Sequence, residues 1–387
     1  MTQVADIESR GGRAGTTLLE VDHVVMNYTT KDGDVSAVED GTFDLRNGES
    51  LGLVGESGCG QTSMALTLLR LLPDNGDIRQ GQILLDGEDL VELSEEEMRQ
   101  RRWRDVSMVF QGAMNSWNPV YTVGDQVREA LRLHWPTTLT YNEETERISA
   151  LFEMVGLNSA MVERYPHEFS GGMRQRAVIA MALSCNPKLI IADEPTTALD
   201  VIVQDQILKE LKEVQAELGM SIIYISHDIA VIAEVTDRIG VMYAGKMVEL
   251  GDTLEVFHRP RHPYAYLLLG STPSITGPRR KLAPLEGEPP NLLDPPSGCR
   301  FHPRCPFASD RCRNEEPPMT DIGGGHELLR EAGAGQVSLV AVPAVDLLHR
   351  LRVPCPQDGR CVARHQGGHS GSPGSAAQHG DPQIRHY

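Results

Sequence analysis

The chain has 387 residues and a formal net charge of −18 at pH 7. This length allows two or three domains at roughly 150 residues each. The negative charge argues against a protein that coats nucleic acid, because neutralising a phosphate backbone requires clustered Lys and Arg side chains. It does not argue against a bound nucleotide, because a phosphate-binding loop works mainly through its own backbone N–H groups.

The apolar runs and the N-terminal segment predict where the protein resides. No uninterrupted apolar run approaches the ~20 residues that are needed to span a bilayer. Residues 1–15, MTQVADIESRGGRAG, lack the apolar core of a signal peptide. We therefore expect a cytosolic chain, which can still dock on a membrane protein.

Residues 18–72 predict strands, a glycine-rich loop and a helix, in that order. The stretch 18–54 alternates apolar and polar residues around the turn sequence KDGD. Residues 62–72, TSMALTLLRLL, have the apolar spacing of a helix. The sequence LVGESGCGQTS (53–63) joins the two. A strand, a glycine loop and a helix form the context in which phosphate-binding loops occur.

This loop departs at one position from the phosphate-binding pattern G-x-x-x-x-G-K-S/T. Gly55, Gly60 and Thr62 match, but Gln61 stands where the pattern has lysine. The glycines let backbone amides converge on phosphate oxygens at a helix N-terminus. Thr62 would place its hydroxyl on Mg²⁺. The loop residues predicted to bind ATP are Gly55, Glu56, Ser57, Gly58, Cys59, Gly60, Gln61, Thr62 and Ser63.

Further along the chain, two short apolar runs predict buried parallel strands. These runs are KLIIAD (188–193) and SIIYIS (221–226), and both are bounded by turn signals. Between them, residues 201–219 predict a helix that ends at Gly219. Residues 123–184 contain only helical patterns, which predicts a helical block inserted into an α/β core.

Two acidic residues, Asp193 and Glu194, end the first of these strands. In a nucleotide site, Asp193 would hold Mg²⁺, directly or through water. Glu194 would polarise the attacking water as a general base. An isolated Asp-Glu pair is often only two solvated acids, but here a phosphate loop precedes it at the expected spacing.

Residues 169–183, FSGGMRQRAVIAMAL, resemble the signature motif of ATP-binding-cassette (ABC) ATPases. Ser170, Gly171 and Gly172 match the motif, and Met173 stands where many members carry Gln. The resemblance implies that these four residues contact a nucleotide held on the phosphate loop of a partner domain.

Other motifs of the same family follow in the expected order. Gln111 in MVFQ matches the Q-loop, where it would bind Mg²⁺ together with Thr62 and Asp193. The other positions implied by the resemblance are the D-loop residue Asp200, the switch histidine His227 and the adenine-stacking Tyr28. The catalytic residues are predicted to be Glu194, His227 and Gln111.

The resemblance also implies an α/β fold. We expect an ABC-type P-loop ATPase core with an antiparallel β subdomain, a helical subdomain and a small C-terminal Cys-containing appendage. The nucleotide-binding domain is expected at 18–260, with the helical subdomain at about 112–184. The appendage is expected at 261–364. Residues 1–17 and 365–387 are expected to be disordered tails.

Residues 110–120, FQGAMNSWNPV, and HRPRHPYAYLLLGSTP from residue 258 narrow the family. They resemble the ATP-binding subunits of oligopeptide, dipeptide and nickel importers. This implies ATP hydrolysis that powers import of peptides or similar small solutes from the cytoplasmic face of the cell membrane. It also implies a second ATPase subunit in a heterodimer, two transmembrane permease subunits and, indirectly, an extracytoplasmic solute-binding protein. No nucleic acid is expected to bind, because the chain lacks the second cassette or coiled-coil insertion of ABC proteins that act on ribosomes or DNA.

Gln61 keeps a hydrogen-bond donor but lacks the charge of lysine. A hydrogen bond to a charged group contributes about 1.5–3 kcal/mol, and loss of a transition-state donor slows hydrolysis by roughly 10²-fold. We therefore expect weak ATP binding and poor turnover at this chain's own site. The alternative function is a nucleotide-gated structural subunit with little turnover of its own. The sequence also leaves open that Gln61 is an introduced or erroneous residue.

The C-terminal quarter contains a cluster of cysteines. In a reducing cytosol, such a cluster favours a metal over disulfides. The spacing of Cys299, Cys305 and Cys312 matches the one that holds a 4Fe–4S cluster in relatives. Relatives place a fourth cysteine where this chain has Arg330, so we expect Cys355, or else Cys361, to complete the cluster. Zinc, or three thiols without metal, are the alternatives.

Overall fold

The computed structural model describes residues 15–271 and 285–329. Their strands are β1 (Thr17–Thr30), β2 (Gly33–Arg46), β3 (Ser50–Val54), β4 (Gly76–Leu85), β5 (Glu88–Asp89), β6 (Val106–Val109), β7 (Leu189–Asp193), β8 (Ser221–Ile225), β9 (Arg238–Tyr243), β10 (Lys246–Asp252), β11 (Met319–Asp321) and β12 (Glu327–Leu329). The α-helices are α2 (Gln61–Leu68), α3 (Glu95–Arg101), α4 (Val123–His134), α5 (Tyr141–Met154), α6 (Gly171–Ala182), α7 (Val201–Leu218), α8 (Ile229–Val235), α9 (Thr253–His258), α10 (Pro263–Gly270) and α11 (Asp310–Asn314). Short 3-10 helices are η1 (Ala113–Asn115), η2 (Ser159–Met161), η3 (Pro166–Glu168) and η4 (His302–Arg304).

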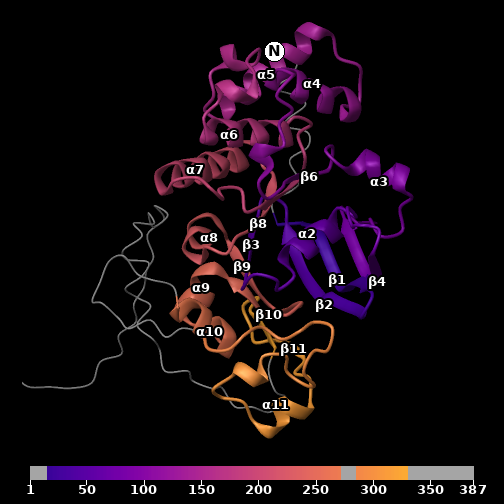
Figure 1. Cartoon of the computed structure of the whole chain (residues 1–387), viewed down its shortest axis with the longest axis vertical. Coiled ribbons are helices and arrows are strands. Elements are labelled where there is room, and N and C mark those ends of the chain that lie inside the picture. Colours follow the sequence, from indigo (N-terminus) through magenta and orange to yellow (C-terminus); the bar gives the residue numbers. More distant parts are fainter. Residues whose placement is uncertain (1–14, 272–284, 330–387) are drawn as a thin grey trace, which may run out of the picture. The chain divides into compact units, whose positions relative to one another are not determined.

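An eight-stranded sheet in the described residues carries the main core, in the order β11-β12-β10-β9-β3-β8-β7-β6. The strands from β9 to β6 pair in parallel, and β3 lies between β9 and β8 (Figure 1). Every residue of β3, β7 and β8 is buried. This is the pattern of a sheet covered on both faces, and it confirms the predicted α/β fold class.

Alternate residues of the parallel strands face two different cores. In β7, Ile190 and Ala192 pack with the helical block, whereas Leu189 and Ile191 pack against the antiparallel sheet and α2. That second sheet has the order β2-β1-β4-β5 and begins with the β1–β2 hairpin, which pairs Thr30 with Gly33. The central strands are therefore fixed from both sides.

Helices α4, α5 and α6 contact one another in the helical block. Side-chain caps begin each helix: Thr122 for α4, Thr140 for α5 and Ser170 for α6. Helix α2 ends at Leu68, earlier than the predicted helical stretch to residue 72. The reason is local, because Arg70 adopts a positive φ of 49°.

Across the described residues, no helix has both the length and the apolar composition that are needed to cross a membrane.

The described C-terminal residues 285–329, called the appendage below, pack against the rest of the described chain around the Phe301 side chain. Phe301 is 1% exposed. Its ring centroid lies 5.1 Å from that of Tyr243 in β9 and 5.3 Å from that of Tyr264 in α10. Strand β12 also pairs with β10, through Leu328 opposite Glu249. The appendage is thus joined to the edge of the main sheet.

Phe301→Ala should lower the free energy of unfolding by about 3–5 kcal/mol, because it leaves a cavity between the two tyrosines. Urea unfolding of the full-length chain, followed by circular dichroism, measures the change. Phe307→Ala is the matched control, because Phe307 lies in the same appendage with 51% of its surface exposed. The control should change the free energy by about 0.5 kcal/mol or less. Equal losses in the two variants would contradict the packing role of Phe301.

Candidate functional site

The predicted site residues gather at one edge of the parallel sheet. The glycine loop follows β3, Asp193 ends β7, His227 follows β8 and Gln111 follows β6. Because these strands are parallel and paired in register, their carboxyl ends meet at the same edge. In open α/β sheets this edge is where ligands bind.

The glycine loop has a backbone that larger side chains would not allow. A Cβ atom on Gly55 would lie 2.3 Å from the carbonyl oxygen of Met242. Gly60 has a φ of 107°, and a Cβ there would lie 2.3 Å from the carbonyl oxygen of Ala37. Gly58 has a φ of 82°. The loop is therefore specified by glycine at each of these positions.

Helix α2 begins at Gln61 directly after this loop, and its N-cap, Gly60, offers no side-chain hydrogen bond. The first N–H groups of a helix have no partner within the helix. They point outward together with the positive end of the helix dipole, which makes this end of α2 an anion-binding site.

Gln61 turns its side chain toward the protein body. Its Nε2 donates to the carbonyl oxygen of Leu53 at 2.8 Å, and its Oε1 accepts from the Cys59 thiol at 3.2 Å. Burial raises the pKa of this thiol to about 12, so the thiol stays protonated as a donor at neutral pH. Both ends of the Gln61 amide are thus engaged within the base of the loop.

Tyr28 in β1 stands beside the same loop. Its hydroxyl donates to the Ser63 Oγ at 3.2 Å, which joins the antiparallel sheet to the first turn of α2. The Tyr28 residue is partly buried.

Glu194 is the centre of the polar network at this edge. Its Oε2 accepts from Gln111 Nε2 at 2.8 Å and from the Thr197 hydroxyl at 2.8 Å. Its Oε1 lies 2.9 Å from the His227 Nδ1. The structure therefore brings together the three residues predicted to be catalytic, which come from the ends of β6, β7 and β8.

The surroundings of Glu194 favour its ionised form. Burial raises the pKa of the carboxyl, but the hydrogen bonds from His227, Thr197 and Gln111 outweigh it and hold the pKa below its ordinary value. The backbone also has a positive φ of 47°. For a residue other than glycine this conformation is sparsely populated, and such residues cluster at active sites.

Asp193 and Thr62 form a second pair, suited to a hard cation. The Thr62 side chain lies beside the Asp193 carboxylate and opposes the rise in its pKa. Asp193 is 1% exposed, and its Oδ1 is buried without a hydrogen-bond partner. Burial raises the pKa of this carboxyl, and the charge of Glu194 adds to the effect. A magnesium ion would supply the missing partner, and hydroxyl and carboxylate oxygens are ligands that it prefers.

The signature residues lie at the start of α6, beside the start of α7. Ser170 Oγ accepts from the Met173 backbone N–H at 3.3 Å. A Cβ on Gly172 would lie 2.6 Å from Val203, so only glycine allows this contact between the helices. In the described part of the chain, no hydrogen bond joins Ser170 or Met173 to the glycine loop.

Asp200 caps α7 and accepts from the backbone N–H groups of Ile202 at 3.1 Å and Val203 at 3.0 Å. The first turn of that helix exposes 79% of Val201 and 81% of Ile202. Gly171 faces Leu199, and a Cβ atom on this glycine would lie 3.5 Å from the Leu199 side chain. The start of the signature helix therefore lies beside Leu199, which immediately precedes Asp200.

The cysteine prediction finds no support in the described residues. Over 15–271 and 285–329, no group of three or more His, Cys, Asp or Glu side chains is arranged to hold a metal ion. The three predicted ligands in the described residues, Cys299, Cys305 and Cys312, are not joined in disulfides, and Cys312 Sγ accepts from the backbone and hydroxyl of Ser309 at 3.4 Å. His326, which could complete a site of three thiolates, instead bonds Glu249 through its Nε2 at 2.8 Å. Cys355 lies outside the described residues, as do Cys361 and Arg330.

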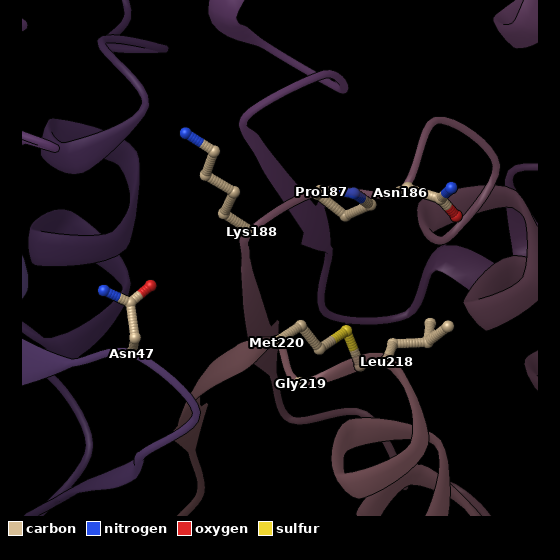
Figure 2. Close-up of a pocket in the computed structure, with 7 residues that line it drawn as sticks. All are labelled: Asn47, Asn186, Pro187, Lys188, Leu218, Gly219 and Met220. Carbon is tan, nitrogen blue, oxygen red and sulfur yellow. The ribbon is translucent and has the colours of Figure 1, made fainter. Parts of the chain in front are cut away.

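A small pocket lies away from this site (Figure 2). Its lining residues are Asn47, Asn186, Pro187, Lys188, Leu218, Gly219 and Met220. Lys188 and Met220 immediately precede β7 and β8, so the pocket is at the amino ends of the parallel strands. The ligand edge of the sheet is the opposite one.

Three residues at the site were not identified from the sequence. Thr197 lies only three residues after Glu194, to which its hydroxyl donates. This short spacing is a signal from which the role of Thr197 could have been predicted. Tyr264 accepts a hydrogen bond from the Glu56 backbone N–H at 2.9 Å, and Arg304 pairs with the Glu56 carboxylate. These two act across long sequence separations, and no local pattern indicates them.

Comparison with known proteins identifies two family regions. The sequence model of the ABC transporter family matches residues 38–197. The model of the oligopeptide/dipeptide transporter C-terminal region matches residues 248–312.

Curated relatives match most of the chain. The dipeptide transport ATP-binding protein DppD of Bacillus subtilis is 44% identical over 312 residues, which cover 80% of this chain and 92% of the relative. The oligopeptide transport ATP-binding protein OppD of Salmonella typhimurium is 44% identical over 324 residues, which cover 83% of this chain and 96% of the relative.

Solved structures share the fold of the cassette. The dimeric ATP-binding cassette MJ0796, in a post-hydrolysis state with ADP and phosphate, aligns with a TM-score of 0.55 and 26% identity. The alignment covers 61% of this chain and 98% of that chain. The cassette cbiO1 of Clostridium perfringens, part of the transporter complex cbiONQ, aligns with a TM-score of 0.55 and 27% identity. It covers 63% of this chain and 91% of that chain.

Proposed function

The chain belongs to the ABC transporter family, and on that premise we propose that it powers the import of peptides or similar small solutes across the cytoplasmic membrane. It is an ABC-type ATPase and fits the ATP-binding subunits of peptide importers, as its relatives and its C-terminal region indicate. One observation carries the catalytic part of the proposal: Glu194 is held by Gln111, Thr197 and His227 beside the anion-binding end of α2.

In this proposal each residue at the sheet edge has one task. Amides of the glycine loop and α2 bind the phosphates, and Tyr28 stacks on the adenine. Thr62, Asp193 and Gln111 would hold Mg²⁺, which neutralises charge on the phosphates. Glu194 accepts the proton of the attacking water, and it is ionised for this task because its pKa is low.

The proposed partner subunits would contact the signature residues and the exposed first turn of α7. We propose that the signature residues, from Ser170 to Met173, complete the nucleotide site of a second, different ATPase subunit. The exposed Val201 and Ile202 support a protein contact next to the D-loop. Two transmembrane permease subunits would place the pair at the cytoplasmic face of the membrane, where an extracytoplasmic solute-binding protein delivers the solute to the permease.

We further propose that the site on this chain's own phosphate loop is impaired. Gln61 carries no charge, and its amide is bonded to Leu53 and Cys59. The phosphates therefore gain no cation from this position. The partner's loop, facing Ser170, would then perform most of the hydrolysis. The same bonds favour the second candidate, a nucleotide-gated structural subunit that binds ATP but hardly hydrolyses it.

Glu194→Gln should leave ATP rather than ADP on this chain's loop. Water activation is lost, whereas Asp193 still binds Mg²⁺. The nucleotide content of the purified complex after incubation with Mg-ATP measures the effect. Glu213→Gln is the control, because Glu213 is exposed on α7, and its ADP content should equal that of the wild type. ADP that accumulates at the wild-type rate in the Glu194 variant would mean either that this site is already silent or that Glu194 is not the base, and identifying which of the two loops retains the nucleotide separates these outcomes.

Ser170→Arg should lower ATP turnover of the assembled complex by about 100-fold or more, because the bulk enters the partner's site near the γ-phosphate. Steady-state phosphate release measures the rate. Thr137→Arg adds the same side chain to the exposed loop between α4 and α5 and should leave the rate unchanged. Unchanged turnover in the Ser170 variant would refute a site that is shared between two subunits.

Gln61→Lys tests the impaired site directly. The assay uses a complex whose second ATPase subunit lacks its own general base, so that only this chain's loop supports turnover. Lysine should raise that turnover by roughly 10²-fold, because it restores a cation to the transition state. Gln61→Met, which has similar length and no charge, should not raise it. A wild-type rate equal to that of the lysine variant would show an unimpaired site and would exclude the structural-subunit alternative.

A further inference from the structure

An ion pair between Arg304 of the C-terminal appendage and Glu56 connects the appendage to the phosphate loop. Arg304 Nη1 donates to Glu56 Oε2 at 2.7 Å, and Arg304 Nη2 donates to Glu56 Oε1 at 3.0 Å. The two residues are 248 positions apart, and Glu56 is the second residue of the loop. This two-point contact fixes the plane of the carboxylate as well as its distance.

The guanidinium itself is immobilised. The Arg304 side chain is 5% exposed. Its Nε donates to the carbonyl oxygen of Glu286 at 2.9 Å, and the group lies 5.7 Å from the centre of the Tyr243 ring. Burial opposes its charge, but the hydrogen bonds to Glu56 and Tyr243 outweigh burial and hold its pKa above the ordinary value. Arg304 is therefore a fixed positive charge at the back of the loop.

A second bond from the same side holds the backbone of Glu56. Its N–H donates to the Tyr264 hydroxyl at 2.9 Å, and Tyr264 packs against Phe301 of the appendage. The carbonyl oxygen of Glu56 accepts a hydrogen bond from the Cys59 N–H at 3.1 Å. Because the Glu56 backbone is bonded both to Tyr264 and to Cys59, fixing Glu56 also fixes the middle of the loop. The backbone amides there are the ones that would face the phosphates.

The pair also matters electrostatically. An unpaired carboxylate on the second loop residue would repel the triphosphate. In this loop Gln61 supplies no positive charge to offset that repulsion, so the neutralising charge on Glu56 has to come from elsewhere. Arg304 is the cation that contacts Glu56, and it comes from the appendage.

We propose that Arg304 is a positioning residue for ATP binding: it neutralises Glu56 and fixes the loop, so that the appendage forms part of the nucleotide site. The proposal rests on the binding of ATP to this chain's own loop. It does not depend on the transported solute or on the identity of the second ATPase subunit.

The test measures the affinity of the full-length chain for Mg-ATP by equilibrium titration. Arg304→Ala should weaken binding by about tenfold, the size expected when one charge-assisted interaction is lost. Arg311→Ala is the matched control, because Arg311 lies in the same appendage and pairs with Glu315 on an exposed surface. Its affinity should equal that of the wild type.

The decisive variant removes both charges. Adding Glu56→Gln to Arg304→Ala should restore part of the lost affinity, because no carboxylate then repels the phosphates, although the loop is still not held from the appendage. A purely structural role of Arg304 predicts no such recovery. Arg304→Lys keeps the charge without the two-point contact, and it should fall between Arg304→Ala and the wild type.

Three outcomes would overturn the proposal: Arg304→Ala binding as tightly as Arg311→Ala, a double variant as weak as Arg304→Ala, or Arg304→Lys as weak as Arg304→Ala. If Arg304→Ala does not fold, the comparison of Arg304→Gln, which also lacks the charge, with its own Glu56→Gln double variant decides in the same way. A wild-type chain that binds no Mg-ATP would refute the proposed function of the loop itself. That result is distinct from a wild type that binds and an Arg304→Ala variant that binds equally well.

Discussion

The parallel pairing of β6, β7, β8 and β3 is the constraint on which the site depends. Each strand delivers one part of the chemistry at its carboxyl end, and the register of the ladders determines how those parts face one another. The strands are buried on both faces, so the ends can shift only if two cores are disturbed. A rigid sheet therefore holds Glu194 in a strained backbone conformation, with three hydrogen-bond partners around its carboxylate.

Charge is divided unequally over this edge. The two adjacent acids have opposite pKa shifts, because burial dominates at Asp193 and hydrogen bonds dominate at Glu194. The buried Asp193 carboxylate is thus suited to binding a cation, and the Glu194 carboxylate stays ionised, so that it is able to accept a proton. The loop adds no cation through Gln61. Positive potential for the proposed phosphates therefore has to come from the start of α2 and from the proposed Mg²⁺, and the Arg304 contact cancels the negative charge of Glu56.

The sequence is sufficient to predict the parts of this site that lie in short contiguous motifs. The glycine loop, the acids after β7 and the residues after β6 and β8 carry their own spacing, and parallel strands bring them together. The sequence does not predict where side chains turn. Nothing in GCGQTS shows that the Gln61 amide is bonded to Leu53, and a pairing such as Arg304 with Glu56 leaves no local pattern. The cysteine spacing suggested a metal, whereas the described residues contain no group of three or more His, Cys, Asp or Glu side chains arranged to hold one.

The most direct test of this account is a structure of the assembled complex with Mg-ATP bound at this chain's phosphate loop. We predict that Gln61 Nε2 stays within hydrogen-bond distance of the Leu53 carbonyl oxygen and that backbone amides of the loop contact the β- and γ-phosphates. Finding the Gln61 amide on the β- or γ-phosphate, released from Leu53 and Cys59, would contradict the account of an impaired site.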